Sequence, residues 1–308
     1  SSKRDSNPAD LHSKIVFKGN HVRIIESFSL SKAVWSVTFK MLLKHPRILL
    51  PFLIKAIFEG LILAVLFYSP RPPFSIIFAQ PIKSFFGASF LHYPYNFNLL
   101  PTLLYYGQIF VMVTSGVIMY GMAMGMVSQA HSEGEEVKIF GNFNRAARRY
   151  FALIGIWLIT FILSIMVSKV PPIIIKKLMQ PSPSAMLLLQ IVSYIGIVLV
   201  FAIEAFFIYA YPALIIERKG FFRAIGRSFS VVRHVFLTTI ILIFVPRLIE
   251  FLYMFVKQKQ QGLMNLTAPE ITLVILGVGI FLTFVADALI FLSAANLFIL
   301  KQETEKGG

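Results

Sequence analysis

The chain has 308 residues, of which 57% are hydrophobic and 14% are charged, and its mean hydropathy is +0.76. A soluble domain has roughly 45–50% apolar and about 25% charged residues, so this composition indicates a membrane protein. The absence of cysteine excludes disulfides, thiolate nucleophiles and cysteine-ligated metals. The net charge of +15 suits Lys and Arg held against anionic headgroups, and we expect no nucleic-acid partner.

Six apolar runs are long enough to cross a membrane, because about 20 residues of helix span the roughly 30 Å of hydrocarbon. They lie at approximately 48–68, 102–128, 150–170, 185–215, 235–256 and 271–300. The predicted parts are a polar cytoplasmic tail at 1–27, a six-span membrane domain at 28–300 and a cytoplasmic tail at 301–308. The predicted fold class is an all-α integral membrane protein with six transmembrane helices.

A short basic, amphipathic stretch precedes the first, third and fifth spans, at 31–44, 138–149 and 221–234. Twenty of the 29 Lys and Arg residues fall on the side of the two tails, and seven fall on the other side. The positive-inside rule then places both termini in the cytoplasm, in a multi-pass protein of the cytoplasmic (inner) membrane. The pattern predicts three parallel hairpin repeats, each entered by a basic amphipathic cytoplasmic helix.

Basic residues of these entry helices recur at four-residue spacing, which places them on one helix face. We expect this face to contact anionic lipid headgroups or a partner, with the helix lying in the headgroup plane. The alternative is that each helix extends its span inward and packs on the cytoplasmic face of the bundle. The residues concerned are Lys32, Lys40, Lys44, Arg145, Arg149, Arg223 and Arg227.

The first outside loop, at 69–101, contains eight aromatic residues, six prolines and no acidic residue. Aromatic enrichment is typical of an interfacial belt or of a cap half-inserted in the membrane. The alternative is a docking surface for a protein partner, because an exposed apolar surface of this size needs lipid or protein to cover it.

Six ionisable residues fall within the spans, where an unpaired charge facing lipid would be costly, so we expect them to be paired inside the bundle. They are Lys55, Glu59, Glu204, Arg247, Glu250 and Asp287. Lys55 and Glu59 are four residues apart, and Arg247 and Glu250 three apart, so each pair can form within one helix. Because four acids face two bases, either acids are protonated or a cation or a substrate ammonium joins them.

This charged set has two interpretations. In one, Glu59, Glu204, Arg247 and Asp287 form a proton- or cation-coupled site. In the other, the charges form a structural network that holds the six helices together. Pro246 precedes Arg247 and predicts a kink in span five, of the kind that often lines a binding site.

The second span contains a GxxxG motif at Gly121 and Gly125, which favours close helix packing inside the protein over a dimer face. Catalytic signatures are missing from the sequence: there is no HExxH, GxSxG or Walker A motif, and all six histidines lie outside the spans. We therefore expect no enzymatic activity, no metal site and no cofactor.

The segment at 211–233, YPALIIERKGFFRAIGRSFSVVR, resembles the cytoplasmic connection of the glycerophosphoryl diester phosphodiesterase membrane-domain superfamily, which includes the YciC-like membrane proteins. The first entry helix, with AVW followed by FKMLLKHPRILLP, is similar to the start of that domain. The resemblance implies a six-helix all-α bundle. It implies no activity, because in phosphodiesterases of this group the catalysis resides in a separate soluble domain that this chain lacks.

Two functions follow from these features. The first is a non-catalytic membrane protein that acts as an accessory or scaffold subunit or as a lipid-interacting factor. The alternative is a proton- or cation-coupled transporter or channel that uses the intramembrane acidic residues.

Overall fold

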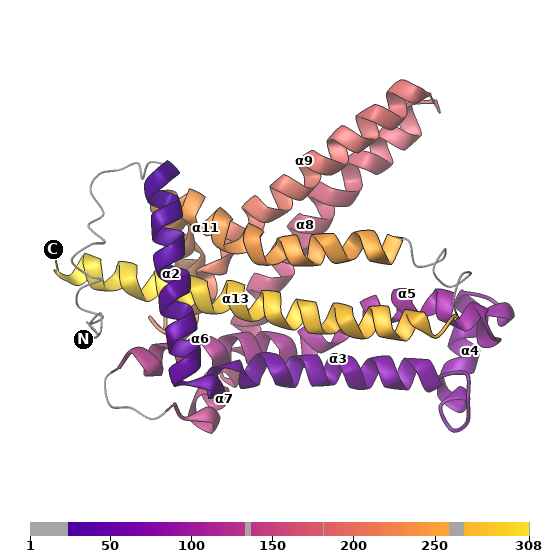
Figure 1. The fold of residues 1–308 in the computed structure, drawn as a ribbon, viewed down its shortest axis with the longest axis horizontal. Helices are drawn as coiled ribbons and strands as arrows, with labels where there is room; N and C mark the ends of the chain where they lie inside the picture. Colours follow the sequence, from indigo (N-terminus) through magenta and orange to yellow (C-terminus); the bar gives the residue numbers. More distant parts are fainter. Residues whose placement is uncertain (1–23, 133–136, 181, 259–267, 308) are drawn as a thin grey trace, which may run out of the picture.

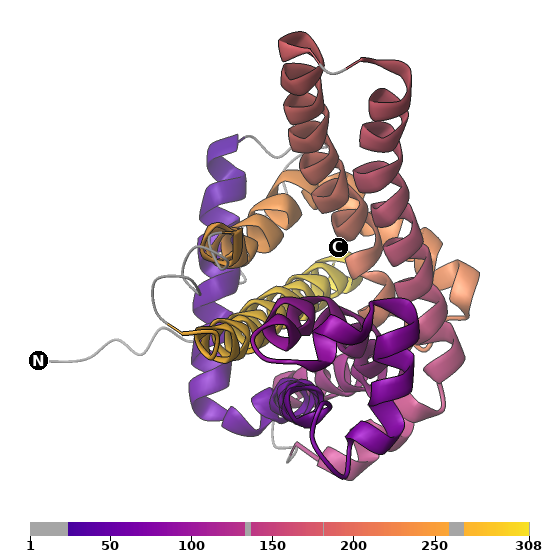
Figure 2. The same ribbon diagram turned by 90° about the vertical axis from the view of Figure 1, so that its right-hand side faces the viewer.

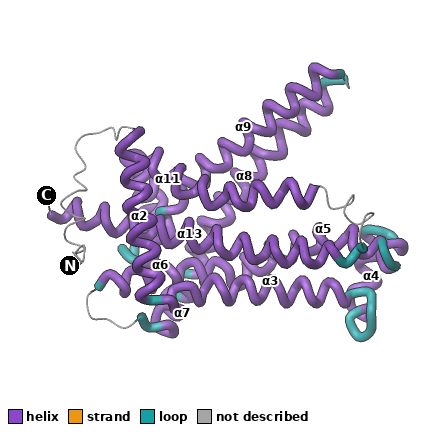
Figure 3. The backbone as a smooth tube through the Cα atoms, in the orientation of Figure 1, coloured by secondary structure: helices purple, strands orange, loops and turns teal. Residues whose placement is uncertain are grey.

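The computed structural model describes residues 24–132, 137–180, 182–258 and 268–307, which form helices and turns with no strand among them (Figure 3). Six helical stretches are long and apolar enough to cross a membrane: Pro46–Tyr68, Tyr95–His131, Tyr150–Leu178, Pro183–Ile215, Phe221–Met254 and Ile271–Glu305. The prediction of an all-α, multi-pass membrane protein is therefore confirmed.

The helices follow one another along the chain in three stages. The first comprises α2 (Ile24–Lys44), η1 (Pro46–Leu49), α3 (Leu50–Tyr68), α4 (Ser75–Phe85), η2 (Ala88–Leu91), α5 (Tyr95–Val111), η3 (Met112–Gly116) and α6 (Val117–His131). The second comprises α7 (Ile139–Ala147), α8 (Tyr150–Leu178), α9 (Pro183–Ile208) and α10 (Ala210–Ile215). The third comprises α11 (Phe221–Gln258) and α13 (Ile271–Gly307).

Helical structure extends into both expected tails. Residues 1–23 of the first tail lie outside the described part of the chain, and residues 24–27 belong to α2. At the other end α13 continues to Gly307, so residues 301–307 of the second tail are helical.

The segment at 69–101, expected to be an outside loop, is largely helical. It contains the 11-residue helix α4 and the short helix η2, and its last seven residues are the start of α5. Two of its aromatic residues, Tyr93 and Phe97, pack edge to face, and Phe97 is buried. The second span is therefore longer than predicted, because Pro101 lies within α5 instead of before it.

Helix α2 lies across the end of the bundle and crosses α3 and α13 instead of running along them (Figure 1). Its inner face carries Val34 and Thr38, both fully buried against α11 and α13. The Asn296 side-chain amide on α13 donates a hydrogen bond of 2.8 Å to Thr38 Oγ1. This contact fixes α2 to the bundle, so it is not a continuation of α3; His45 and η1 separate the two.

The break in α11 lies at Val235, where φ is −127° and ψ is 27°, and the helix continues through Pro246. The backbone of α11 thus leaves helical geometry at Val235 and not at Pro246, and the bend at Pro246 stays a prediction. A break leaves backbone carbonyls without helical partners, and Thr239 Oγ1 donates to the Val235 carbonyl at 2.9 Å. The Tyr209 hydroxyl lies 2.7 Å from the same Thr239 oxygen, so the break has support from α11 itself and from the residue that joins α9 to α10.

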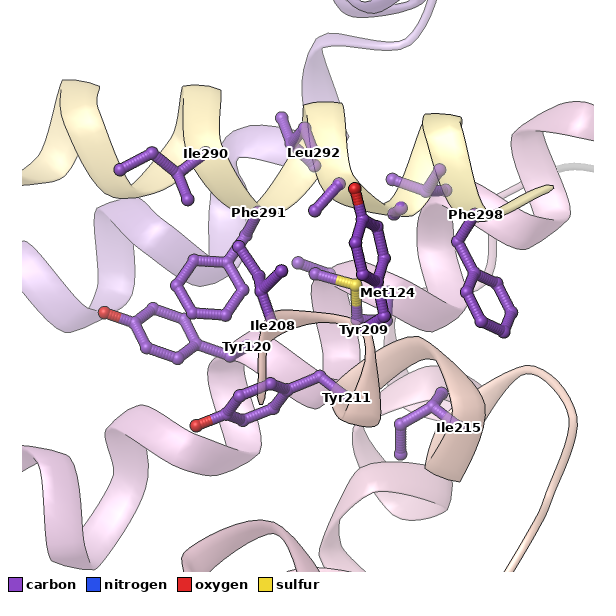
Figure 4. Packing of buried hydrophobic residues seen from close by; sticks show 14 of the residues in the cluster. Tyr120, Met124, Ile208, Tyr209, Tyr211, Ile215, Ile290, Phe291, Leu292 and Phe298 are labelled. Carbon is purple, nitrogen blue, oxygen red and sulfur yellow. The ribbon is translucent and has the colours of Figure 1, made fainter. Parts of the chain in front are cut away.

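The main hydrophobic core lies toward the end of the bundle covered by α2. It contains residues of α6, α10, α11 and α13. Figure 4 shows part of it, where side chains of α6 and α10, such as Met124 and Tyr211, lie beside Phe291 of α13. Toward the opposite end α8 and α9 remain paired but lean away from the other helices (Figures 1 and 2). The main core is therefore at one end of the bundle, and the α8–α9 pair diverges from the other helices toward the opposite end.

The GxxxG glycines of α6 face inward. A Cβ on Gly121 would lie 2.8 Å from Leu153 Cδ1 on α8, and a Cβ on Gly125 would collide with the side-chain oxygen of Asn142 on α7. The missing side chains thus allow α7 and α8 to approach α6, in agreement with the predicted internal packing.

Candidate functional site

The structure brings all six intramembrane charged residues together. On the inner side of the group, Lys55 Nζ lies 2.8 Å from Glu59 Oε1 and 3.1 Å from Asp287 Oδ2. The Tyr120 hydroxyl donates to the same Asp287 oxygen at 2.5 Å, and the Gln108 amide donates to Glu59 Oε2 at 3.3 Å. This inner cluster connects α3, α5, α6 and α13.

Arg247 of α11 connects the inner cluster to the remaining acids. Its NH2 nitrogen lies 2.9 Å from Glu204 Oε1 on α9, and its NH1 nitrogen lies 2.7 Å from Glu250 Oε2 and 3.4 Å from Asp287 Oδ1. One guanidinium therefore contacts three carboxylates on three helices. The geometry joins Glu204 and Asp287, which have no partner within their own spans.

The charged group has a buried layer and an accessible layer. The side chains of Lys55, Glu59 and Asp287 are 6%, 2% and 5% exposed, respectively. Arg247 is 23% exposed, and Glu204 and Glu250 are each 20% exposed. The first three are placed to hold helices together, whereas the second three can also meet a ligand.

A cavity of about 370 Å³ lies beside this accessible layer. All six membrane-spanning stretches contribute to its walls, and the six charged residues are among its lining residues. It lies where the α8–α9 pair faces α3, α5, α11 and α13. Its volume falls within the range of about 300–1,000 Å³ that is usual for organic-ligand pockets.

Aromatic side chains line much of the remaining wall. On α8, Trp157 and Phe161 stack with ring centroids 4.9 Å apart and planes at 14°. On the side of the main core, the rings of Tyr120 and Phe291 stack at 4.0 Å, and Tyr211 meets Phe291 edge to face at 5.4 Å (Figure 4). The cavity thus combines a carboxylate-rich wall with aromatic walls.

Two further hollows lie outside this site. One, of about 510 Å³, lies along α8, α9 and α11 beyond the charged group and includes Ser193 and Met254. The other, of about 820 Å³, is an apolar groove between α3, α4 and α5, lined by side chains such as Phe58, Phe85 and Phe110. Neither contains an acid–base pair.

The predicted headgroup-contacting residues differ in their surroundings. Lys32, Lys40, Lys44 and Arg223 are exposed, and Arg145 and Arg149 are half-buried. Arg227 is turned into the protein: its Nε lies 3.2 Å from Glu217 Oε1, and its NH2 lies 2.5 Å from Glu305 Oε2. Arg227 therefore joins the α10–α11 connection to the end of α13, and its charge is used within the chain.

The structure gives contacts for several characteristic residues of the segment at 211–233. Glu217 pairs with both Arg227 and Lys219, the latter at 2.7 Å. Ala224 is fully buried, and the Ser228 hydroxyl donates to the Phe206 carbonyl at 2.6 Å. These contacts lock the start of α11 against α9 and α10.

Sequence reasoning missed several residues of the cavity. Gln108 carried a usable signal, because an amide within an apolar span needs a hydrogen-bond partner. No such indication was present in the sequence for the aromatic residues of the cavity, because aromatic residues occur throughout the spans. These residues are Tyr120, Tyr211, Trp157 and Phe161. In the part of the chain that the structure describes, no group of three or more His, Asp or Glu residues is arranged to hold a metal ion.

Comparison with protein-family models, with curated proteins and with solved structures finds no match for this chain.

Proposed function

We propose that the protein is a non-enzymatic membrane carrier whose central cavity takes up a cation, with Glu204, Arg247 and Glu250 as the responsive groups. The observation that carries this proposal is the convergence of all six intramembrane charges on one cavity walled by all six spans. Four carboxylates against two bases leave a formal charge of −2 when all are ionised, which protons or a bound cation offset.

The accessible layer suits such a role because its contacts can be exchanged. While the site holds no other cation, Arg247 pairs with both Glu204 and Glu250 and offsets one of their two negative charges. An incoming cation competes with Arg247 for these carboxylates, and the Glu204–Arg247 contact is also a link between α9 and α11. Occupation of the site and the position of the α8–α9 pair are thereby coupled.

The test is charge movement across liposomes that contain the purified full chain. We expect wild-type protein to produce currents on a solid-supported membrane after jumps in pH or in the concentration of a cation. Glu204→Gln should abolish these currents while leaving the yield of folded protein unchanged. Glu270→Gln, an equivalent change at an exposed position directly before α13, serves as the control. Equal currents from the two variants would refute the carrier proposal.

The proposed arrangement in the membrane comprises three hairpin units in the cytoplasmic (inner) membrane, with both termini inside. Three consecutive helix pairs support it, since α3 packs on α5, α8 on α9 and α11 on α13. One end of the bundle carries the basic segments, namely α2, α7, the start of α11 and the end of α13 (Figure 1). Helix α4 lies at the other end. The resemblance of the segment at 211–233 to the phosphodiesterase membrane domains supports the same architecture.

A second candidate is a lipid-interacting accessory factor, favoured by the outer face of α2. Three apolar side chains on that face are largely exposed: Ile25, Phe28 and Leu43, at 83%, 59% and 85%. They share the face with Lys32, and this combination suits a helix in the headgroup plane. In this proposal anionic headgroups bind the basic residues, and the apolar groove beside α4 provides a surface for lipid or for a protein partner.

Single cysteines test both the orientation and the position of α2, because the chain contains none of its own. We expect a membrane-impermeant maleimide to label Lys83→Cys and Lys177→Cys in intact cells, and Arg223→Cys only after permeabilisation. A polarity-sensitive dye on Leu43→Cys should report an apolar environment that strengthens when anionic lipid is added. Labelling of Arg223→Cys from outside would contradict the orientation, and a dye in a water-like environment would contradict the in-plane position of α2.

A further inference from the structure

The walls of the central cavity indicate which kind of cation it takes. A bare metal ion needs several oxygen ligands directed at one point. Here both oxygens of Glu59 and both oxygens of Asp287 already have partners in Lys55, Gln108, Tyr120 and Arg247. Among the described residues no acidic or histidine group is arranged for a metal. The cavity is therefore poorly suited to an inorganic ion held by protein oxygens.

The same cavity is well suited to an organic cation. Its volume of about 370 Å³ is more than ten times the roughly 30 Å³ that one water molecule occupies in the liquid. The stacked rings of Trp157 and Phe161 belong to α8, whereas the accessible acids belong to α9 and α11. Aromatic faces attract cations through the negative potential above the ring, and substituted ammonium groups are bound in this way by aromatic cages.

Glu250 supplies an independent sign of an incomplete site. One of its carboxylate oxygens, Oε2, is paired with Arg247, whereas Oε1 is buried without a hydrogen-bond partner. A buried acceptor without a partner is unusual and costly in a native protein. Glu250 thus retains acceptor capacity that Arg247 does not use, and a rotation of its carboxylate would bring this oxygen to the cavity that the residue lines.

We propose that the cavity binds an organic monocation, a substituted ammonium with an aromatic or branched aliphatic body. The charged group lies beside Glu204 and Glu250 in competition with Arg247 and faces the rings of Trp157 and Phe161, which also contact the apolar body. This assignment rests on the proposed carrier function and specifies its substrate class.

The chain has two tryptophans, Trp35 on α2 and Trp157 in the cavity, so Trp35→Phe makes Trp157 the sole tryptophan reporter. The full chain with this substitution is placed in phosphatidylcholine nanodiscs and titrated with benzyltrimethylammonium. The comparison ligands are dimethylbenzylamine N-oxide, which has a similar shape and no net charge, and potassium ion. We expect a saturable change in Trp157 fluorescence with the ammonium compound, and a much weaker response to both comparison ligands.

Two variants in the same background locate the binding site. Phe161→Leu should weaken binding roughly three- to tenfold, because one aromatic face is lost. Phe151→Leu, at an exposed position of the same helix, should leave binding unchanged. Glu204→Gln should weaken binding by at least as much as Phe161→Leu. The Phe161 and Phe151 variants keep the proposal testable if the acid variant does not fold.

Equal binding of the N-oxide, or equal affinities of the Phe161 and Phe151 variants, would overturn the organic-cation assignment. An absent response to benzyltrimethylammonium, combined with Glu204-dependent currents on pH or potassium jumps, would overturn this assignment and leave the carrier function standing. The absence of both binding and Glu204-dependent currents would remove the two proposals together.

Discussion

Replacing Asp287 by alanine is expected to destabilise the protein by about 3–5 kcal/mol, the usual cost of removing one partner from a buried ion pair. Asp287 accepts from the Lys55 ammonium and the Tyr120 hydroxyl and faces the Arg247 guanidinium. Its loss leaves Lys55 with Glu59 alone and leaves the Tyr120 hydroxyl buried without this acceptor. Helices α3, α6 and α11 lose their common contact on α13.

Unfolding of the detergent-solubilised protein, followed by tryptophan fluorescence, measures this loss. Asp287→Asn should cost less than Asp287→Ala, because an amide still accepts a hydrogen bond from Tyr120. Thr283→Ala, one turn away on α13 and in the same cavity, is the control and should have a small effect. An Asp287→Ala protein as stable as the control would show that the buried cluster does not hold the helices together.

Replacing Lys55 by methionine is expected to have a comparable effect on stability. The substitution removes the ammonium that lies between Glu59 and Asp287 and leaves Glu59, whose side chain is 2% exposed, without a cation. Asp287 keeps Arg247 and Tyr120 as partners. The cost should therefore arise mainly from Glu59, which must remain buried with its charge unpaired or take up a proton.

The double variant Lys55→Met with Glu59→Gln identifies that cause. Glutamine at position 59 carries no charge and can still accept from the Gln108 amide. The double variant should recover roughly 1–2 kcal/mol relative to Lys55→Met alone, a coupling typical of contacting residues. The same unfolding assay measures it, and losses that simply add would contradict direct coupling between Lys55 and Glu59.

The six ionisable positions were visible in the sequence because charge within an apolar run is a local property. Two of their contacts were also predictable, because residues three or four apart on a helix share a face. The contacts of Glu204 and Asp287 were not, because each depends on a helix distant in the chain. The roles of Tyr120 and Trp157 were even harder to predict from the sequence, since one aromatic residue among many gives no indication of where its ring points.

Two features of the structure had no local signal in the sequence, because they depend on packing. One is the break in α11 at Val235, where Thr239 and Tyr209 supply hydrogen bonds. The other is the pairing of Arg227 with Glu217 and Glu305 within the chain. The bend at Pro246 and the contact of Arg227 with headgroups or a partner stay predictions.

The sequence alone determined that this is an all-helical, multi-pass membrane protein, because hydrophobic length and the positions of charges are read along the chain without knowledge of its neighbours. The tertiary structure decided which charges are buried, which face a cavity and which rings stand opposite them. The rotation and separation of helices set those relations, and they result from side-chain packing across the bundle. One such relation is the inclination of the α8–α9 pair away from the other helices. The central cavity lies beside this pair.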